Sequence, residues 1–411
     1  MANLDVTSTQ YMDHSRMREM NLALILSCLR QEAPLSRSRL AEMTGLTKAT
    51  VSSLVRELIE RKFVCETGSI ISNVGRPSIN LELNPQAGTI IGLEIGVDFL
   101  SAILTNFSAQ VQWKKLEYTT NLLGQQEILA NSFKVLEEAC IQANQHPGNL
   151  LGIGLGVPGL VDHNSGTLLF APNLNWRDVP IRKMVEERFN IPVYVENEAQ
   201  MAALGESYFG AGRYADFVLY VSSGVGLGGG IVLKKQVLQG MNGFAGEIGH
   251  ITIVPDGLPC NCGNTGCWET LASQRAVFRL VRQAIERGRS SLVLRKAGGD
   301  LDRMTIPMII EAAQAGDKVA LEAFQETGHW LGIGIANLIN ALNPEVVVFG
   351  GILSLASDFL MPEMQSEIDR RALPWSSQNT RLVISEYSLD SCVIGGVATV
   401  YHQVLSQPGL L

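Results

Sequence analysis

The stretch that decides the fold runs from Gly243 to Glu269 and reads G-F-A-G-E-I-G-H-I-T-I-V-P-D-G-L-P-C-N-C-G-N-T-G-C-W-E. It contains three of the seven cysteines, Cys260, Cys262 and Cys267, and one of the six histidines, His250. Thiolate sulfur and imidazole nitrogen are the ligands of structural zinc, and a Cys3His set binds it tetrahedrally. The spacing therefore predicts one structural Zn2+ per chain. Buried free thiols or a disulfide are the alternative.

Two carboxylates, Glu247 and Glu269, flank the predicted ligands and are suited to accept hydrogen bonds from a polyol. The motif E-I-G-H followed by C-x-C-G-x-x-G-C-x-E resembles the signature of the ROK family (repressors, open reading frames, kinases). This resemblance covers nearly the whole chain. It implies that the zinc loop, residues 250–267, lies beside a sugar pocket.

The resemblance also implies which residues form that pocket. The segment from Ala171 to Trp176, A-P-N-L-N-W, resembles the family's P-N-L-x-W segment, and Asn197 and Glu198 stand where the family's kinases have Asn and a catalytic Asp. His250 is expected to bind zinc through one ring nitrogen and to offer the other N–H to a sugar oxygen. The implied sugar-binding residues are Asn173, Asn197, Glu198, Glu247, His250 and Glu269.

The N-terminal part of the chain has the pattern of a helix-turn-helix. A short helix with Ser36 as N-cap and Gly45 as its end precedes a second helix that begins after Thr47. The second helix has apolar residues at helical spacing on one face and small, hydroxyl and basic residues on the other, which suits contact with base edges and phosphates. An ordinary helical hairpin is the alternative.

Strand-like residues at 63–65 and 79–83 bracket a polar loop and predict a β-hairpin wing. At the end of that loop, Arg76 lies between Gly75 and Pro77, a setting that suits a narrow A·T-rich minor groove, although a surface turn is the simpler alternative. The residues expected to contact operator DNA are Ser36, Arg37, Thr47, Lys48, Ala49, Thr50, Ser52, Ser53, Arg56, Gly75, Arg76 and Pro77.

Charge is distributed unevenly along the chain, whose net charge is −8. Residues 1–85 carry ten basic and nine acidic side chains, whereas the remainder carries 22 basic and 31 acidic ones. An acidic body with a more basic N-terminal segment fits a local DNA contact.

The expected fold class is α/β, with two domains. Residues 1–85 are expected to form a winged helix-turn-helix DNA-binding domain, and residues 86–411 a ROK sugar-binding domain with two actin-like lobes, the fold of sugar kinases. Within the first lobe, we expect a strand over 191–195 and a helix from about Glu198 to Phe209. The strand and helix order repeats after Asp216, which indicates duplicated architecture without duplicated sequence.

Whether the chain is an enzyme is decided by its phosphate loops. A kinase needs two glycine-rich loops, a carboxylate for Mg2+ and a base. The segment from Ser222 to Ile231, S-S-G-V-G-L-G-G-G-I, is a plausible second loop, but the first reads E-I-G-V-D over 94–98 instead of the kinases' D-I-G-G-T, with bulky Val97 where the backbone must approach phosphate.

We therefore expect no enzyme activity but a sugar-responsive repressor that releases operator DNA when a monosaccharide binds. The stretch V-E-N-E-A resembles the family's xylose-responsive regulators, so xylose is the expected effector and glucose the next. Two alternatives stay open. One is a sugar kinase with an added DNA-binding domain, and the other is a repressor controlled by a protein partner.

The sequence shows no signal peptide and no apolar run of 18 residues, so we expect a cytoplasmic protein without a membrane span. A single helix-turn-helix covers too little DNA for specificity, which favours a homodimer on a two-fold operator, with a tetramer as the alternative.

Overall fold

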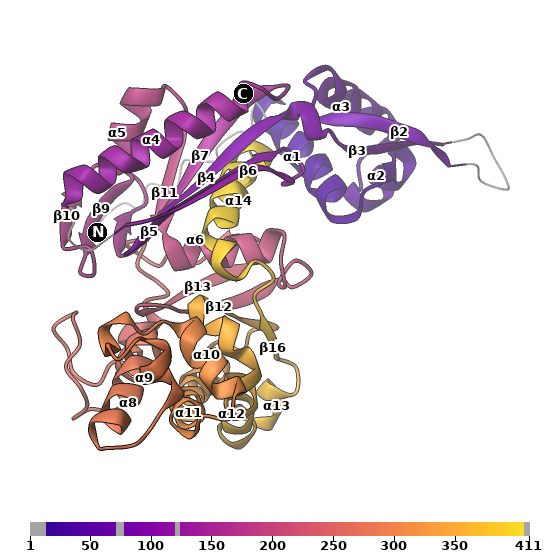
Figure 1. Ribbon diagram of the computed structural model, residues 1–411. Helices are drawn as coiled ribbons and strands as arrows, with labels where there is room; N and C mark the ends of the chain where they lie inside the picture. The colour runs from indigo at the N-terminus through magenta and orange to yellow at the C-terminus, as the bar shows by residue number, and fades with distance from the viewer. Residues whose placement is uncertain (1–13, 71–77, 120–123, 407–411) are drawn as a thin grey trace, which may run out of the picture.

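The structure is a computed structural model that describes residues 14–70, 78–119 and 124–406. Its N-terminal part consists of three helices and a three-stranded antiparallel sheet of order β1-β3-β2 (Figure 1). Their bounds are α1 (His14–Glu32), β1 (Leu35–Ser36), α2 (Arg37–Thr44), α3 (Lys48–Glu60), β2 (Val64–Ile70) and β3 (Ser78–Leu83).

Local capping explains why the two short helices form here. The Ser36 side chain accepts a hydrogen bond from the Arg39 backbone N–H, and α2 ends at Gly45, which adopts the left-handed φ of 70° that glycine allows. The Thr47 side chain accepts from the Thr50 N–H and starts α3. The helix-turn-helix is therefore confirmed, and β2 and β3 pair as the two strands of the expected wing.

The first lobe is built on a five-stranded sheet of order β11-β7-β4-β5-β6. Strands β4, β7 and β11 are parallel, whereas β5 and β6 run antiparallel to their neighbours. Helices α4 and α5 cover one face of the sheet and α14 packs against the other. The bounds are β4 (Gly88–Ile95), β5 (Phe99–Asn106), β6 (Val111–Tyr118), α4 (Gln125–Ala143), β7 (Asn149–Val157), α5 (Ile181–Phe189) and β11 (Val193–Asn197).

Two details of this lobe differ from expectation. The strand predicted over 191–195 lies at Val193–Asn197, because Pro192 has no N–H to donate to a neighbouring strand. A small antiparallel sheet of order β10-β9-β8 was not predicted. Its strands are β8 (Leu160–Asp162), β9 (Thr167–Ala171) and β10 (Trp176–Val179).

The second lobe repeats the arrangement of the first. Its sheet has the order β14-β13-β12-β15-β16, in which β12, β15 and β16 are parallel. Strands β13 and β14 run antiparallel to their neighbours, as β5 and β6 do in the first lobe. The strands are β12 (Phe217–Ser223), β13 (Leu227–Leu233), β14 (Gln236–Val237), β15 (Val346–Gly350) and β16 (Arg381–Ile384).

Helices from the second half of the chain cover one face of this sheet, and α6 packs against the other face. The bounds of the remaining helices are α6 (Glu198–Tyr208), α7 (Glu269–Ala272), α8 (Gln274–Glu286), α9 (Leu292–Lys296), α10 (Ile306–Gln314), α11 (Lys318–Leu342), α12 (Ser357–Arg371), α13 (Pro374–Ser377) and α14 (Ser391–Ser406). The short 3-10 turns are η1 (Pro85–Ala87), η2 (Ile248–His250), η3 (Leu301–Arg303), η4 (Ile352–Ala356) and η5 (Ser388–Asp390). None of the helices in the described ranges is long and apolar enough to cross a membrane.

Helices α6 and α14 pack against each other between the two sheets (Figure 1). Glycines allow the close approach of α14 to β7 and to α6. A Cβ on Gly154 of β7 would lie 2.2 Å from the carbonyl oxygen of Gly396, and one on Gly205 of α6 would lie 2.7 Å from the backbone nitrogen of Gly395. The pair therefore forms the packed connection between the lobes.

Candidate functional site

The four predicted metal ligands lie together. The donor atoms of His250, Cys260, Cys262 and Cys267 are all within 4.8 Å of one another. The loop that carries the thiols is closed by hydrogen bonds from the Cys260 N–H to the Asn264 carbonyl (2.8 Å) and from the Gly263 N–H back to the Cys260 carbonyl (3.0 Å). This cluster of three sulfurs and one nitrogen could hold a metal ion.

The His250 ring is oriented by the groups on its two sides. Its Nδ1 lies 3.6 Å from the Cys260 Sγ, and its Nε2 lies 3.9 Å from a carboxylate oxygen of Glu247. Nδ1 is thus the nitrogen that faces the thiols, and Nε2 is the one that faces the carboxylate.

Glu269 lies against the same cluster. Its Oε1 accepts a hydrogen bond from the Cys260 thiol at 2.9 Å and lies 3.9 Å from His250 Nδ1. Burial is the main cause that raises the pKa of the Cys260 thiol, and the Glu269 carboxylate adds to the rise.

Asn173 and Glu269 come from different lobes and meet beside Gly226. A Cβ on Gly226 would lie 2.8 Å from the Glu269 Oε2 and 3.8 Å from the Asn173 Nδ2. Gly226 therefore leaves the space into which both side chains point.

The Asn197 amide is already used by the fold. Its Oδ1 accepts from the backbone N–H groups of Ala199 and Gln200, which caps α6, and its Nδ2 donates to the Gly159 carbonyl at 2.9 Å. Asn197 thus caps α6 and fixes the position of the next residue, Glu198.

Glu198 has a buried carboxyl oxygen, Oε2, that makes no hydrogen bond within the described residues. Burial raises the pKa of Glu198 to about 7, and the Glu247 carboxylate adds to the rise. Burial also raises the pKa of Glu247, with the nearby Glu269 contributing. Carboxyl groups thus converge on one region: Glu198 directly follows β11 of the first lobe, and Glu247 directly precedes η2 in the second.

A second buried carboxyl lies behind Glu198 and was not predicted as part of the site. Glu94, at the end of β4, has a pKa raised to about 8, mainly by burial and then by Glu198, and its Oε2 has no partner among the described residues. Cys392 of α14 is also in hydrogen-bonding range of Glu94. The only sequence signal was the position of Glu94 in the first glycine-bearing turn.

The expected DNA-contacting face is exposed on α3. Thr47, Lys48, Ala49, Ser53 and Arg56 are exposed in the structure. Thr50, Ser52, Ser36 and Arg37 are half-buried, and the hydroxyls of Ser36 and Thr47 serve as helix caps.

Arg37 donates to the Glu66 carboxylate on β2 at 2.8 Å, so part of its charge is compensated within the protein. The wing residues Gly75, Arg76 and Pro77 lie outside the described residues.

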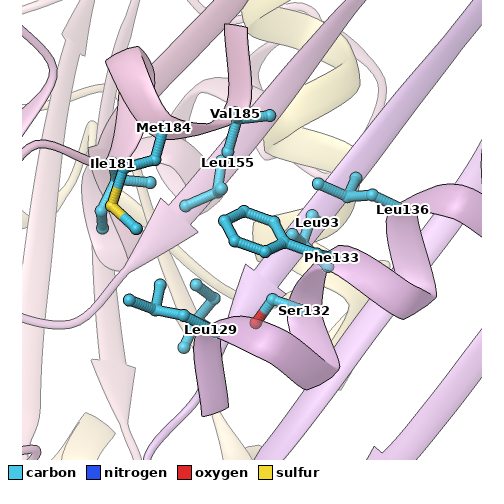
Figure 2. A pocket seen from close by; sticks show the side chains of 10 residues that line it. Leu93, Leu129, Ser132, Phe133, Leu136, Leu155, Ile181, Met184 and Val185 are labelled. Carbon is cyan, nitrogen blue, oxygen red and sulfur yellow. The ribbon is translucent and has the colours of Figure 1, made fainter. Parts of the chain in front are cut away.

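Two other regions of the first lobe and its neighbourhood lie apart from this site. Figure 2 shows side chains of α4, α5 and the sheet pointing toward one another, and the space between them has no room for a water molecule, so it is packed core. A cavity of about 350 Å3 lies between the β8–β9 turn and the segment 239–244. None of the expected sugar-binding residues lines it.

Comparisons with known proteins agree with this architecture. Residues 90–403 match the ROK family, and residues 24–64 match a winged helix-turn-helix DNA-binding domain. The xylose repressor of Caldicellulosiruptor bescii is 36% identical over 398 residues, which cover 96% of this chain and 99% of that protein.

Two solved structures are also similar. A ROK family transcriptional regulator, described as a homolog of the E. coli MLC protein, superposes with a TM-score of 0.81 at 30% identity and covers 95% of this chain and 97% of its own. A ROK family glucokinase from Streptomyces griseus, solved with glucose and AMPPNP, gives a TM-score of 0.69 at 32% identity and covers 77% of this chain and 100% of its own. With a winged helix-turn-helix ahead of a two-lobed body that matches over residues 90–403, the chain belongs to the ROK family.

Proposed function

We propose that this protein is a transcriptional repressor that binds operator DNA through its winged helix-turn-helix and releases it when D-xylose binds between the two lobes. One observation carries the proposal. The same chain presents an exposed α3 face with Lys48 and Arg56 and a convergence of carboxyl groups, Glu198 and Glu247, from opposite lobes. Full-length similarity to a xylose repressor supports both halves of the proposal.

The sugar is held by hydrogen bonds to groups from both lobes. Asn173 and Glu198 belong to the first lobe, and Glu247, His250 and Glu269 belong to the second. Sugar hydroxyls can donate to these carboxylates and accept from His250 and the Asn173 amide. Since the pKa of Glu198 is raised to about 7, this group can donate or accept near neutral pH. A ligand that contacts both lobes favours the arrangement in which the lobes approach each other.

The metal we propose is one Zn2+ per chain, because three cysteines and a histidine form its usual structural ligand set. Its role would be to fix the orientation of His250, whose Nδ1 faces the thiols and whose Nε2 is left for Glu247 and the sugar.

A sugar kinase is the second candidate, because the S. griseus glucokinase is similar over 77% of this chain. Two features of the first turn speak against it. Glu94 stands where the family's kinases have the Asp of their first loop, and its longer side chain is buried. Val97 also places a branched side chain where a phosphate loop needs close approach of the backbone.

The assembly we propose is a homodimer on a two-fold operator, with a tetramer as the alternative. One helix-turn-helix reads one half-site, and two copies of the chain supply the second. Sedimentation of the full chain with and without its operator tests this proposal. A complex of one chain per operator would contradict it.

The experiment that tests the function uses purified full-length protein and an operator selected from genomic fragments. Operator affinity is measured by fluorescence anisotropy with D-xylose, D-glucose and other aldoses, each with and without ATP and Mg2+. We expect D-xylose to weaken operator binding without nucleotide. Sugar-dependent ATP consumption, or an operator affinity that no aldose changes, would overturn the proposal.

A further inference from the structure

The DNA-binding segment contacts the two helices that connect the lobes, and it does so at a dense cluster of ring side chains. We call this set the junction cluster. It consists of Arg30, Phe63, Phe107, Tyr208, Tyr401 and His402. It joins α1 and the end of the helix-turn-helix to α6 and α14.

The first contact of the cluster comes from α1. The Arg30 guanidinium carbon lies 4.8 Å from the centre of the Tyr208 ring, a cation–π geometry. Tyr208 is 6% exposed and is the last residue of α6. Its hydroxyl lies 2.5 Å from Nδ1 of His402 on α14, so the same ring connects α1, α6 and α14.

The second contact comes from Phe63, three residues after the end of α3. The Phe63 ring lies 5.5 Å from Phe107 in the β5–β6 turn, and Phe107 lies 5.0 Å from Tyr401 of α14. The hydrophobic core is continuous from the helix-turn-helix through these rings to α6 and α14. Burial on this scale resists independent movement of the DNA-binding segment.

The other end of α6 lies in the proposed sugar site. Glu198 is its first residue, and Gln200, in the same turn, donates to the carbonyl oxygens of Gly243 and Ala245 at 3.0 and 2.9 Å. These carbonyls belong to the loop that leads into Glu247. The eleven residues of α6 therefore run from Glu198 in the proposed sugar site to Tyr208 in the junction cluster.

The last turn of α6 is also held firmly. The ammonium of Lys235, which follows β13 in the second lobe, donates to the carbonyl oxygens of Ser207 (2.5 Å), Arg213 (2.9 Å) and Ala215 (3.3 Å). A movement of the second lobe relative to the first thus reaches the end of α6 directly, beside the ring that Arg30 covers.

We infer that α6 carries the effector signal, and that Arg30 and Tyr208 of the junction cluster are the residues through which lobe movement repositions the DNA-binding segment. This inference rests on the proposed function. The physical reason is that both ligands act on one packed element, and a sugar changes operator affinity only if the two arrangements of that element differ in free energy.

The test compares Arg30→Met and Tyr208→Phe with the wild type. Arg30→Met keeps the aliphatic stem and removes the cation, and Tyr208→Phe keeps the ring and removes the hydrogen bond to His402. For each protein, operator affinity is measured with and without saturating D-xylose, and xylose affinity is measured with and without operator. The matched control is Arg188→Met, which removes a cation 5.1 Å from the Phe133 ring, on the face of the first lobe covered by α4 and α5.

Allosteric coupling typically changes affinity by about 5- to 150-fold. The ratio of operator affinity without xylose to operator affinity with xylose should lie within this range and be the same in the wild type and in Arg188→Met. In both junction variants we expect this ratio to be within about twofold of one. Their affinity for xylose without DNA should change little. If both junction variants respond to xylose as fully as the wild type, the inference is wrong and the repressor function stands. If the wild type itself responds to no aldose, the proposed function fails and the inference fails with it.

Discussion

At the scale of single residues, the buried carboxyls make the stability of the protein depend on pH. The pKa of Glu94 is raised from 4.5 to about 8 in the folded state. The folded carboxyl therefore keeps a proton that the unfolded chain releases between about pH 4.5 and 8. Its stabilising contribution is complete below the unfolded pKa and is lost as the pH rises through the folded pKa.

We predict that Glu94→Gln removes part of this pH dependence. The wild type should lose free energy of unfolding between pH 5 and 8, and the variant should gain roughly 1 to 3 kcal/mol relative to it over that range. Urea unfolding at pH 5, 6, 7 and 8 measures the difference. Glu187→Gln, at a side chain that is 67% exposed, serves as the control and should leave the slope unchanged. Equal slopes in wild type and Glu94→Gln would contradict the assignment.

The metal ligands give a second prediction at this scale. Cys262→Ser removes one of four clustered donors, so the zinc content should fall from about one per chain to near zero, and xylose affinity should fall with it. Cys140→Ser changes a free cysteine of α4 outside the cluster and should leave both unchanged. Elemental analysis of freshly purified protein measures the metal. A wild type without metal, prepared without chelator, would speak against zinc.

At the scale of elements, the helix boundaries were predictable from the sequence because they depend on neighbouring residues. Ser36, Gly45 and Thr47 were identified as helix boundaries because caps depend on neighbouring backbone groups, and all three lie where expected. The strand after Pro192 was placed two residues early, since sequence alone did not show which N–H groups pair with β7.

Long-range proximity was less predictable from the sequence. The family motif placed Glu198 and Glu247 in one site, but nothing local indicated that Glu94 lies behind them. Likewise, no periodicity shows that Arg30 lies over Tyr208, because 178 positions of sequence separate the two residues and only the packing of α1 on α14 brings them together.

The recognition helix provides the prediction at this scale. Lys48 is exposed in the first turn of α3, and we predict that it contacts a DNA phosphate. Lys48→Ala should weaken binding to operator DNA and to non-specific DNA to a similar degree. It should also reduce the magnitude of the slope of log affinity against log salt concentration by about one. Anisotropy titrations at several salt concentrations measure the slope. Lys134→Ala, an exposed lysine on α4, should not change it. A loss confined to one operator sequence would assign Lys48 to base recognition instead.

At the scale of the whole molecule, the two lobes and the DNA-binding segment meet at α6 and α14, so under the proposed function sugar and operator both act on one arrangement of the chain. Linkage requires reciprocity. If xylose weakens operator binding by a given factor, operator must weaken xylose binding by the same factor. Titrating each ligand in the presence and absence of the other measures both factors and tests whether they are equal.

Glu247→Ala tests the whole scheme, because the Glu247 carboxylate lies 3.9 Å from His250 and also raises the pKa of Glu198. Without it, the sugar loses one of its three proposed second-lobe partners and the orientation of a second, His250, is disturbed, so the free energy by which the sugar favours the closed arrangement falls. Operator affinity without sugar should remain within about twofold of wild type, since α3 is untouched. D-xylose should no longer release the DNA even at concentrations that saturate the wild type, which gives a permanently repressing variant. If Glu247→Ala still releases operator at the wild-type xylose concentration, the effector acts through some other part of the molecule. If the variant loses operator binding without sugar, Glu247 instead stabilises the DNA-binding arrangement itself.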